Sequence, residues 1–293
     1  MQTMSMPTQS MPTATPLRIA KIKDHIGAKV TGIDLTQPVD ATTRQRLYRA
    51  LVDNVALVIR DQHFTTQQYL DAAALFGEPM ANEMETKKLS DVPLVSHVDS
   101  LKRTKDGKRV YNGATWHCDH TNQPVPPKFT ALYAVALPDS GGGTSIANAR
   151  AGYAALPDDV KKRIDGLQTV NVIVGSAAKV FDGDRLKWQQ ESGRAPVIHP
   201  LVPTNPDTGA KSIYFHPSKT ENIVGMSPEA SQALLDELVE RTVTPEFIYT
   251  HPWRLGDMLI WDNRAAMHRA NFDYDPAQHR LLYKIIVKGD RPS

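Results

Sequence analysis

The chain contains many short apolar runs separated by turns rich in Gly and Pro, a pattern typical of β-strands. In the first part of the sequence these runs predict strands at residues 17–20, 28–33 and 55–59. Further strands are predicted at residues 129–137, 144–147, 166–174, 195–202, 257–261 and 280–287. Because the later strands lack the regular alternation with helices that a parallel α/β sheet needs, they favour a jelly-roll, or double-stranded β-helix.

Three segments are instead predicted to be helices at the periphery of this β-structure. Residues 40–54 place leucines on one apolar face and begin with an aspartate that can act as the N-cap. A second helix is expected to start at Thr65 or Thr66 and to stop at a Gly-Glu-Pro turn. A third, at residues 227–241, begins with a serine followed by a proline, which suits the first helical position. The predicted fold class is therefore mainly β with peripheral helices.

Two segments fall outside this regular pattern. Residues 1–16 are rich in Met, Thr, Ser, Gln and Pro, and we expect them to form a disordered tail before a single domain at residues 17–293. Residues 80–115 are polar and irregular. Loops of that length inside a domain are usually functional or disordered, so we expect residues 80–115 to form a long loop over the active site.

The composition argues against several classes of protein. A net charge of +2, without a dense block of Lys and Arg, argues against a dedicated nucleic-acid-binding protein. The single cysteine, Cys118, excludes an internal disulfide. No apolar run approaches the roughly 20 residues needed to span a bilayer, and the N-terminal segment lacks the features of a secretory signal. We therefore expect a cytoplasmic protein that binds neither nucleic acid nor membranes.

The candidate chemistry lies in the sequence His117-Cys118-Asp119 and in His268 far downstream. Alternate side chains of an extended strand point the same way, so His117 and Asp119 are expected to converge while Cys118 turns away. With His268 they would form a face of two histidines and one carboxylate, which leaves open the coordination positions that non-haem Fe(II) requires. The same ligands also suit Zn²⁺ with a bound water. A second His-x-Asp sequence begins at His97, and we interpret it as the end of a buried strand followed by a turn.

Several motifs occur together, in the order and with the separations of one known family. They are Trp116-His117-x-Asp119-x-Thr121, Pro126-Pro127, Gly142-Gly143-Thr144 and Trp261-Asp262-Asn263-Arg264-x-x-x-His268. The sequence thus resembles the taurine/2,4-dichlorophenoxyacetate dioxygenase family (TauD/TfdA), whose members are Fe(II)- and 2-oxoglutarate-dependent oxygenases on a double-stranded β-helix. The resemblance extends over most of the chain, from residues 27–35 to residues 280–284.

The resemblance implies a set of metal and cosubstrate ligands. His117, Asp119 and His268 would bind Fe(II), while Arg280 and Thr144 would hold the distal carboxylate of 2-oxoglutarate. An arginine suits this task because its guanidinium is always charged and binds a carboxylate through two parallel hydrogen bonds. A charge at the start of an apolar strand is also costly unless it is paired. The alternatives are a surface arginine at a strand edge and an ordinary strand threonine.

The implied reaction uses O2 to hydroxylate a small organic substrate while 2-oxoglutarate yields succinate and CO2. Hydroxylation beside a heteroatom would lead to cleavage of that C–heteroatom bond. We expect an anionic substrate, because Lys284 stands where family members acting on sulfonates or aryloxyacetates carry a second arginine. Lysine keeps the charge but loses the planar fork, and an outward-facing structural lysine is the alternative. His120 and Trp116 are further candidate substrate contacts, and Arg264 and Arg269 are alternative anion contacts.

Two other functions are compatible with this ligand set. One is a cupin-type Zn-dependent hydrolase or isomerase, and the other is a non-catalytic binding module. Arg280 and Thr144 favour the oxygenase, because a hydrolase does not need a buried anion anchor at that position. Related barrels pair, so a homo-oligomer, either a dimer or a tetramer, is compatible with the resemblance.

Overall fold

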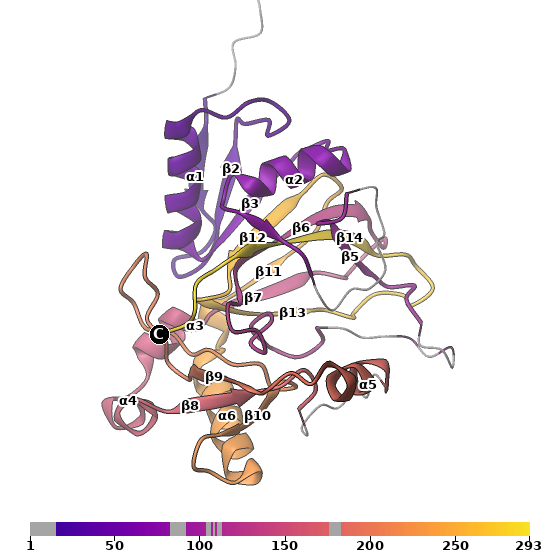
Figure 1. The fold of residues 1–293 in the computed structure, drawn as a ribbon. Coiled ribbons are helices and arrows are strands. Elements are labelled where there is room, and N and C mark those ends of the chain that lie inside the picture. Colours follow the sequence, from indigo (N-terminus) through magenta and orange to yellow (C-terminus); the bar gives the residue numbers. More distant parts are fainter. Residues whose placement is uncertain (1–15, 83–91, 104–106, 108, 110–112, 176–182) are drawn as a thin grey trace, which may run out of the picture.

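The structure is a computed structural model that describes residues 16–82, 92–103, 107, 109, 113–175 and 183–293. All but the last residue of the expected N-terminal tail therefore lies outside the described residues. In the part that is described, helices surround three β-sheets (Figure 1).

The largest sheet combines strands from the beginning, the middle and the end of the described chain. Its order is β1 (Arg18–Lys21), β2 (Ala28–Thr31), β3 (Ala56–Ile59), β12 (Met258–Asp262), β6 (Pro127–Ala136), β14 (Leu281–Lys288) and β4 (Pro79–Met80), and β5 (Ser96–Asp99) also pairs with β14. The neighbouring strands are antiparallel except β2 and β3. Helices α1 (Ala41–Asn54) and α2 (Thr66–Ala74) pack on this sheet (Figure 1), where Leu47, Tyr69 and Phe76 are buried in one core.

A second sheet packs against the largest one and completes the barrel. Its order is β11 (Ile248–His251), β7 (Thr144–Asn148) and β13 (Ala266–Ala270). Ile146 and Ala266 of this sheet share a buried apolar cluster with Leu132, Leu259 and Leu282 of the largest sheet. Two sheets that enclose a common core in this way form the double-stranded β-helix, so the predicted jelly-roll is confirmed.

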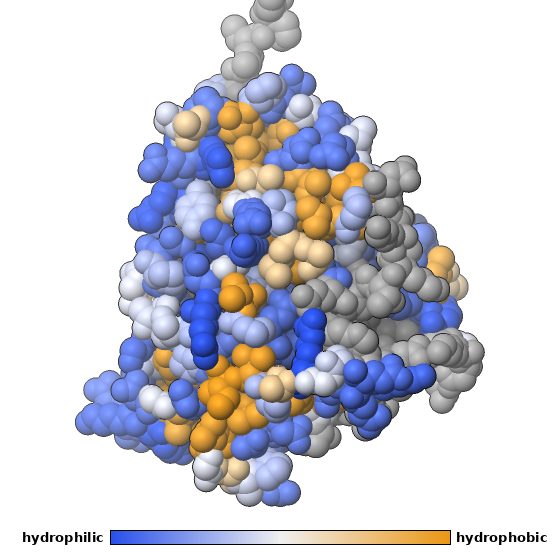
Figure 2. Space-filling model, in the orientation of Figure 1, coloured by the Kyte–Doolittle hydropathy of each residue, from blue (hydrophilic) through white to orange (hydrophobic). Residues whose placement is uncertain are grey.

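The third sheet and most of the remaining helices form a layer beside the barrel. The sheet has the order β10 (Thr220–Ile223), β8 (Gln168–Asn171) and β9 (Val197–Pro200). The helices are α3 (Ala149–Ala155), α4 (Asp158–Ile164), α5 (Gly183–Ser192), α6 (Pro228–Thr242) and the 3-10 helix Pro245–Phe247. Leu235 and Leu238 of α6 are buried with Ile223 of β10. Hydrophobic residues also gather on the visible surface over this layer (Figure 2), and Ile198 and Val224 are among the exposed large hydrophobic residues.

The predicted helix starts have the expected caps. Asp40 accepts a hydrogen bond from a main-chain N–H in the first turn of α1, at 2.8 Å. Thr65, and not Thr66, is the N-cap of α2, where it forms a capping box with Gln68. Ser227 caps α6 in the same manner. Each strand predicted from the sequence is also present, with ends that differ by a few residues. No helix in the described part of the chain combines the length and apolar character that crossing a bilayer requires.

Other parts of the fold differ from the sequence-based expectation. The segment at residues 80–115 is not a loop throughout, because Ser96–Asp99 forms β5 and hydrogen-bonds with β14. His97 therefore lies inside a strand that starts after the apolar run at residues 92–95, and not at the end of one. Strands β10, β11 and β13 and helices α3, α4 and α5 were not predicted. Their short sequences mix polar and apolar residues and acquire regular structure from their partners in the fold.

Candidate metal centre

Main-chain hydrogen bonds bring two histidines together from distant parts of the sequence. The N–H of His117 donates to the carbonyl of His268 at 3.1 Å, and the N–H of His268 donates to the carbonyl of His117 at 2.9 Å. The two ring centroids lie 4.2 Å apart. Cys118 points elsewhere, with its thiol 3.4 Å from the carbonyl of Ala266. The expected alternation of side chains is thus present, although His117 forms only an isolated bridge that leads into a turn.

Asp119 completes a group of three potential metal ligands. One ligand atom from each of His117, Asp119 and His268 lies within 4.8 Å of the others, and all three residues are buried. Nε2 of each histidine lies 3.8 Å from a different carboxylate oxygen of Asp119. Nitrogen and oxygen ligands bind a divalent metal such as zinc at roughly 2.0–2.2 Å. Only a small closing movement would therefore bring the three groups around a single ion, with other coordination positions left open.

The histidine rings are oriented by the groups around them. Nδ1 of His117 lies 2.7 Å from the carbonyl of Thr115, so this nitrogen donates the hydrogen bond and Nε2 is left to bind a metal. The ring of His268 packs against the indole of Trp261, with centroids 4.5 Å apart. Burial lowers the pKa of His117, and it lowers the pKa of His268 well below the ordinary value. Both rings are therefore neutral at neutral pH, as metal coordination requires.

A chain of hydrogen bonds holds the carboxylate of Asp119. The hydroxyl of Thr130 donates to Asp119 at 2.8 Å, and the side-chain amide of Asn263 donates to that hydroxyl at 2.9 Å. Trp261 in turn donates from its indole nitrogen to Asn263 at 3.0 Å. Thr130 could not be predicted as part of the site, because its strand contains no local signal for such a role. Asn263 belongs to a motif that was recognised, but its partner could not be read from the sequence.

Lys284 of β14 points into the metal centre. Its Nζ donates to Asp119 at 3.0 Å, and only 14% of the lysine side chain is exposed. The outward-facing alternative for this lysine is therefore wrong. Burial alone would raise the pKa of Asp119, but the positive charge of Lys284 lowers it well below the ordinary value. The carboxylate is thus ionised, and two neutral imidazoles with one carboxylate are a donor set that fits Fe(II).

Arg280 lies just before β14, and its guanidinium is a candidate for binding an anion. It is only 3% exposed, and it donates to the carbonyl of Gly142 at 2.7 Å and to the hydroxyl of Thr144 at 3.2 Å. No ion pair joins it to a carboxylate in the part of the chain that the structure describes. Burial lowers the pKa of Arg280 to about 10, so the guanidinium is charged at neutral pH. Thr144 also accepts a hydrogen bond from Trp253 at 3.0 Å, which leaves its own proton for a ligand.

The other candidate contacts differ in their surroundings. The chain turns at His120, whose φ of 52° lies in the left-handed region. Trp116 lies beneath the guanidinium of Arg269, which is 4.8 Å from the ring centroid. Arg264 donates to the carboxylate of Asp262 through both Nε and Nη2, at 2.9 Å each. Arg264 therefore braces the loop after β12 and is not available as an anion contact.

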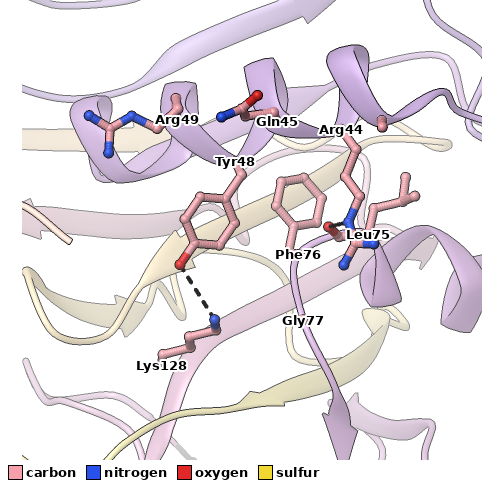
Figure 3. Close-up of a pocket in the computed structure, with 9 residues that line it drawn as sticks. Arg44, Gln45, Tyr48, Arg49, Leu75, Phe76, Gly77 and Lys128 are labelled. Atoms are coloured by element: carbon pink, nitrogen blue, oxygen red, sulfur yellow. Dashed lines mark hydrogen bonds between the residues drawn. The ribbon is translucent and has the colours of Figure 1, made fainter. Parts of the chain in front are cut away.

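A separate cavity of about 430 Å³ lies between α1 and the segment that follows α2 (Figure 3). Its walls include Arg44, Arg49 and Tyr48 of α1 and Lys128 of β6, and Lys128 donates to the Tyr48 hydroxyl at 3.4 Å. None of the residues that line it belongs to the metal centre. The arrangement that can support metal chemistry is therefore the one inside the barrel.

Comparison with known proteins identifies the family. The sequence profile described as "Taurine catabolism dioxygenase TauD, TfdA family" matches residues 18–286. The chain belongs to this family. It is a 2-oxoglutarate-dependent non-haem iron dioxygenase that uses Fe(II), 2-oxoglutarate and O2. Membership of the TauD/TfdA family decides against the zinc hydrolase and the non-catalytic binding module.

Individual relatives match over nearly their whole length. The chain is 33% identical to the (S)-phenoxypropionate/alpha-ketoglutarate-dioxygenase of Sphingobium herbicidovorans, over 94% of this chain and 96% of that protein. It is 32% identical to an alkylsulfatase of Acinetobacter baylyi, over 94% and 86% of the two chains. Among solved structures, a taurine dioxygenase from Burkholderia xenovorans is 30% identical with a TM-score of 0.77, over 94% and 92%. AAD-2 in complex with Mn(II) and N-oxalylglycine is 28% identical with a TM-score of 0.78, over 95% and 99%.

Proposed function

We propose that this TauD/TfdA dioxygenase hydroxylates a small anionic organic substrate at a carbon that bears an ether or ester oxygen. Three relatives are named as a phenoxypropionate dioxygenase, an alkylsulfatase and a sulfate ester dioxygenase. Phenoxypropionate and alkyl sulfates share an anionic group and a C–O bond.

The products of the proposed reaction account for both atoms of O2. One atom of O2 enters succinate, which leaves with CO2 as the products of 2-oxoglutarate. The other atom is inserted into a C–H bond of the substrate. When the new hydroxyl stands on a carbon that also carries an ether or ester oxygen, the product breaks at that C–O bond. The fragments are a carbonyl compound and a phenol, an alcohol or inorganic sulfate.

The side chains of the centre have distinct tasks in this proposal. His117, Asp119 and His268 hold Fe(II). The hydrogen bond from His117 to the Thr115 carbonyl and the one from the Thr130 hydroxyl to Asp119 keep two of these ligands in place. When bound, iron and 2-oxoglutarate supply the activation of O2, which the protein alone cannot perform. The protein positions the reactants and shields them from water.

The single observation that carries the proposal is the buried guanidinium of Arg280, which donates to Thr144 of β7, the strand that pairs with the strand of His268. Arg280 and the free hydroxyl proton of Thr144 would bind the distal carboxylate of 2-oxoglutarate, while its keto acid end chelates the metal. Arg280 reaches this position from the large sheet and Thr144 from the second sheet. The anchor thus lies inside the barrel, where its bonds to a carboxylate are strengthened by low solvent exposure.

A substrate panel tests the proposal. The purified protein, with Fe(II), ascorbate and 2-oxoglutarate in air, is offered both enantiomers of 2-phenoxypropionate, 2,4-dichlorophenoxyacetate and a series of alkyl sulfates. We expect at least one anionic compound to stimulate succinate formation, with release of an equivalent amount of phenol or sulfate. The matched control is His268→Ala, which lacks one ligand and should show only background succinate.

Two results would contradict different parts of this proposal. Succinate formation that never exceeds the His268→Ala background would contradict the assigned roles of the metal ligands. Substrate-stimulated succinate formation without cleavage of any C–O bond would retain the oxygenase but reject the proposed position of hydroxylation.

A further inference from the structure

The two oxygens of the Asp119 carboxylate have different surroundings. Oδ2 accepts a hydrogen bond from the hydroxyl of Thr130 at 2.8 Å and another from Nζ of Lys284 at 3.0 Å. In the part of the chain that the structure describes, no protein group donates a hydrogen bond to Oδ1. Asp119 is only 6% exposed, and a buried oxygen without a donor is costly. Oδ1 is therefore the oxygen that can receive a partner from outside the protein.

Both donors to Oδ2 are held in place by the large sheet. Thr130 of β6 accepts a hydrogen bond from the amide of Asn263 at 2.9 Å, so its own proton is directed to Asp119. Lys284 lies in β14, between β5 and β6, and its carbonyl accepts a hydrogen bond from the hydroxyl of Ser96 at 3.2 Å. Neighbouring strands thus deliver a hydroxyl and an ammonium to the same oxygen.

These two hydrogen bonds decide which oxygen is free to bind a metal. Oδ1 lies 3.8 Å from Nε2 of His117, and Oδ2 lies 3.8 Å from Nε2 of His268, so distance alone does not choose between them. Each carboxylate oxygen has about two acceptor sites, and two donors fill those of Oδ2. A metal cation at Oδ2 would also meet the positive charge of Lys284 at short range, with little solvent between them.

The number of carboxylate oxygens that bind the metal determines how many positions stay open. Carboxylates bind metal ions through one oxygen or through both. Through Oδ1 alone, Asp119 and the two histidines supply three donor atoms, which leaves room for a bidentate cosubstrate and for O2. A second oxygen from Asp119 would take the position that O2 needs.

We propose that Lys284 is a positioning residue which, together with Thr130, holds Oδ2 and makes Asp119 bind the metal through Oδ1 alone. This inference rests on the metal ligands named in the proposed function. Lys284 acts through Asp119 in this role and needs no contact with the substrate. Its ammonium keeps the carboxylate from closing over the last open coordination position.

Mn(II) in place of Fe(II) tests this role, because pulsed EPR in deuterated water counts the water molecules that are bound to Mn(II). The purified protein is saturated with Mn(II), and spectra are recorded before and after the addition of 2-oxoglutarate. Before the addition, we expect Lys284→Met to have one bound water fewer than the parent protein. After it, the parent protein should retain one bound water and Lys284→Met none.

Two further variants separate the proposed role from a general effect on the fold. Lys284→Arg keeps a charged donor and should retain the bound waters of the parent protein at both stages. Lys211→Met removes an exposed lysine that pairs with Asp165 at 2.8 Å, and it should also leave these waters unchanged. A merely structural role for Lys284 would weaken Mn(II) binding without changing the number of waters on the bound ion, and this result would overturn the inference.

Three other outcomes would also contradict it. These are the parental number of waters in Lys284→Met, an equal loss of water in Lys284→Arg, and a parent protein that retains no water after 2-oxoglutarate is added. The last of these does not depend on the folding of any variant. The visible charge-transfer absorption of the protein with Fe(II) and 2-oxoglutarate, recorded without oxygen, tests the proposed function by itself. If that absorption forms and Lys284→Met has the parental number of waters, only this inference fails.

Discussion

Three side chains create the metal centre, but their neighbours determine how well it is organised. The carbonyl of Thr115 selects which nitrogen of His117 faces the metal, and Trp261 supports the ring of His268. The motif that contains Trp261 and Asn263 thus supports a histidine ligand through Trp261 and the carboxylate ligand through Asn263. Such supporting contacts commonly change metal affinity by about 10- to 100-fold when they are removed.

The bond from Thr130 to Asp119 offers a direct test of this support. In Thr130→Val the hydroxyl is lost, Asp119 loses a donor and the amide of Asn263 loses the shorter of its two hydrogen bonds. We expect the Kd for Fe(II), or for Mn(II) as a redox-stable substitute, to rise by about 10- to 100-fold in calorimetric titrations. Thr130→Ser keeps the hydroxyl and should bind metal like the parent protein. Equal affinities for the valine and serine variants would show that the hydroxyl does not support the ligand.

Arg280 offers a second test, directed at the cosubstrate. In Arg280→Ala we expect the Kd for 2-oxoglutarate to rise by about 10- to 100-fold, because a charge-assisted hydrogen bond contributes about 1.5–3 kcal/mol. The measurement is the titration of the charge-transfer absorption with 2-oxoglutarate. Arg269→Ala removes a cation that lies over Trp116 and serves as the matched control, with little change expected. An unchanged Kd in Arg280→Ala would remove this arginine from the cosubstrate site.

Among the elements, β14 begins directly after Arg280, carries Lys284 and pairs with both β6 and β5. The second sheet supplies Thr144 from β7 and His268 from β13. Helices α1 and α2 contribute no ligand, but they cover the outer face of the large sheet and keep it closed. The stability of these helices is therefore separable from the chemistry of the centre.

The capping box of α2 tests this separation. Thr65→Ala removes the hydroxyl that accepts from the N–H of Gln68 at 3.2 Å. We expect the free energy of unfolding to fall by about 1 kcal/mol, while metal affinity stays unchanged. Urea unfolding monitored by circular dichroism measures the first quantity and Mn(II) titration the second. Thr65→Ser retains the cap and should match the parent protein. A loss of metal binding in the alanine variant would show that α2 and the site are coupled.

Much of the barrel could be predicted because its strands are encoded locally. β3 is a continuous apolar run, and β6, β12 and β14 are mainly apolar, with single polar residues inside them or at their ends. β13 was missed because its sequence, Ala-Met-His-Arg-Ala, has an exposed and a half-buried residue at one end and no clear alternation. It becomes a strand by pairing with β7. Its conformation therefore depends on tertiary contacts.

The candidate site also has some features that the local sequence predicts and others that depend on tertiary contacts. Its three metal ligands could be placed because short motifs name them, and the structure brings them together. The contact of Lys284 with Asp119 and that of Lys219 with Asn122 join residues far apart in the sequence. No local periodicity specifies such pairs. The orientation of the His120 side chain could not be predicted either. A turn replaces the regular strand in which side chains would alternate between the two faces.

For the molecule as a whole, buried histidines make the metal-free protein sensitive to acid. Burial lowers the pKa of six histidines in the described chain, namely His117, His120, His199, His216, His251 and His268. In the unfolded chain these groups would titrate near 6.5. Below that pH the unfolded state binds more protons than the folded state. The contribution of these histidines to the free energy of unfolding is therefore fully present above about pH 6.5. It decreases as the pH falls, by up to about 1.4 kcal/mol per pH unit for each histidine.

Denaturation at several pH values measures this effect. We expect the urea midpoint of the metal-free protein to be constant above neutral pH and to fall steeply between about pH 6.5 and pH 5. His199→Gln should make the urea midpoint depend less steeply on pH, since His199 is completely buried and bonds to the carbonyl of Gln123 at 2.9 Å. The exposed His63→Gln is the control and should leave the slope unchanged. A midpoint that is flat across this range would contradict the proposed role of the buried imidazoles.

The pairing of β14 with β6 has a consequence for the synthesis of the protein. The ribosome completes the turn that bears Asp119 long before it makes His268 and Lys284. Until then the carboxylate has neither its second histidine partner nor its ammonium partner, and β6 lacks its neighbour on one side. We therefore expect iron to be acquired only after translation has passed β14. Cells starved of iron would accumulate folded apoprotein that can be activated later by the metal alone.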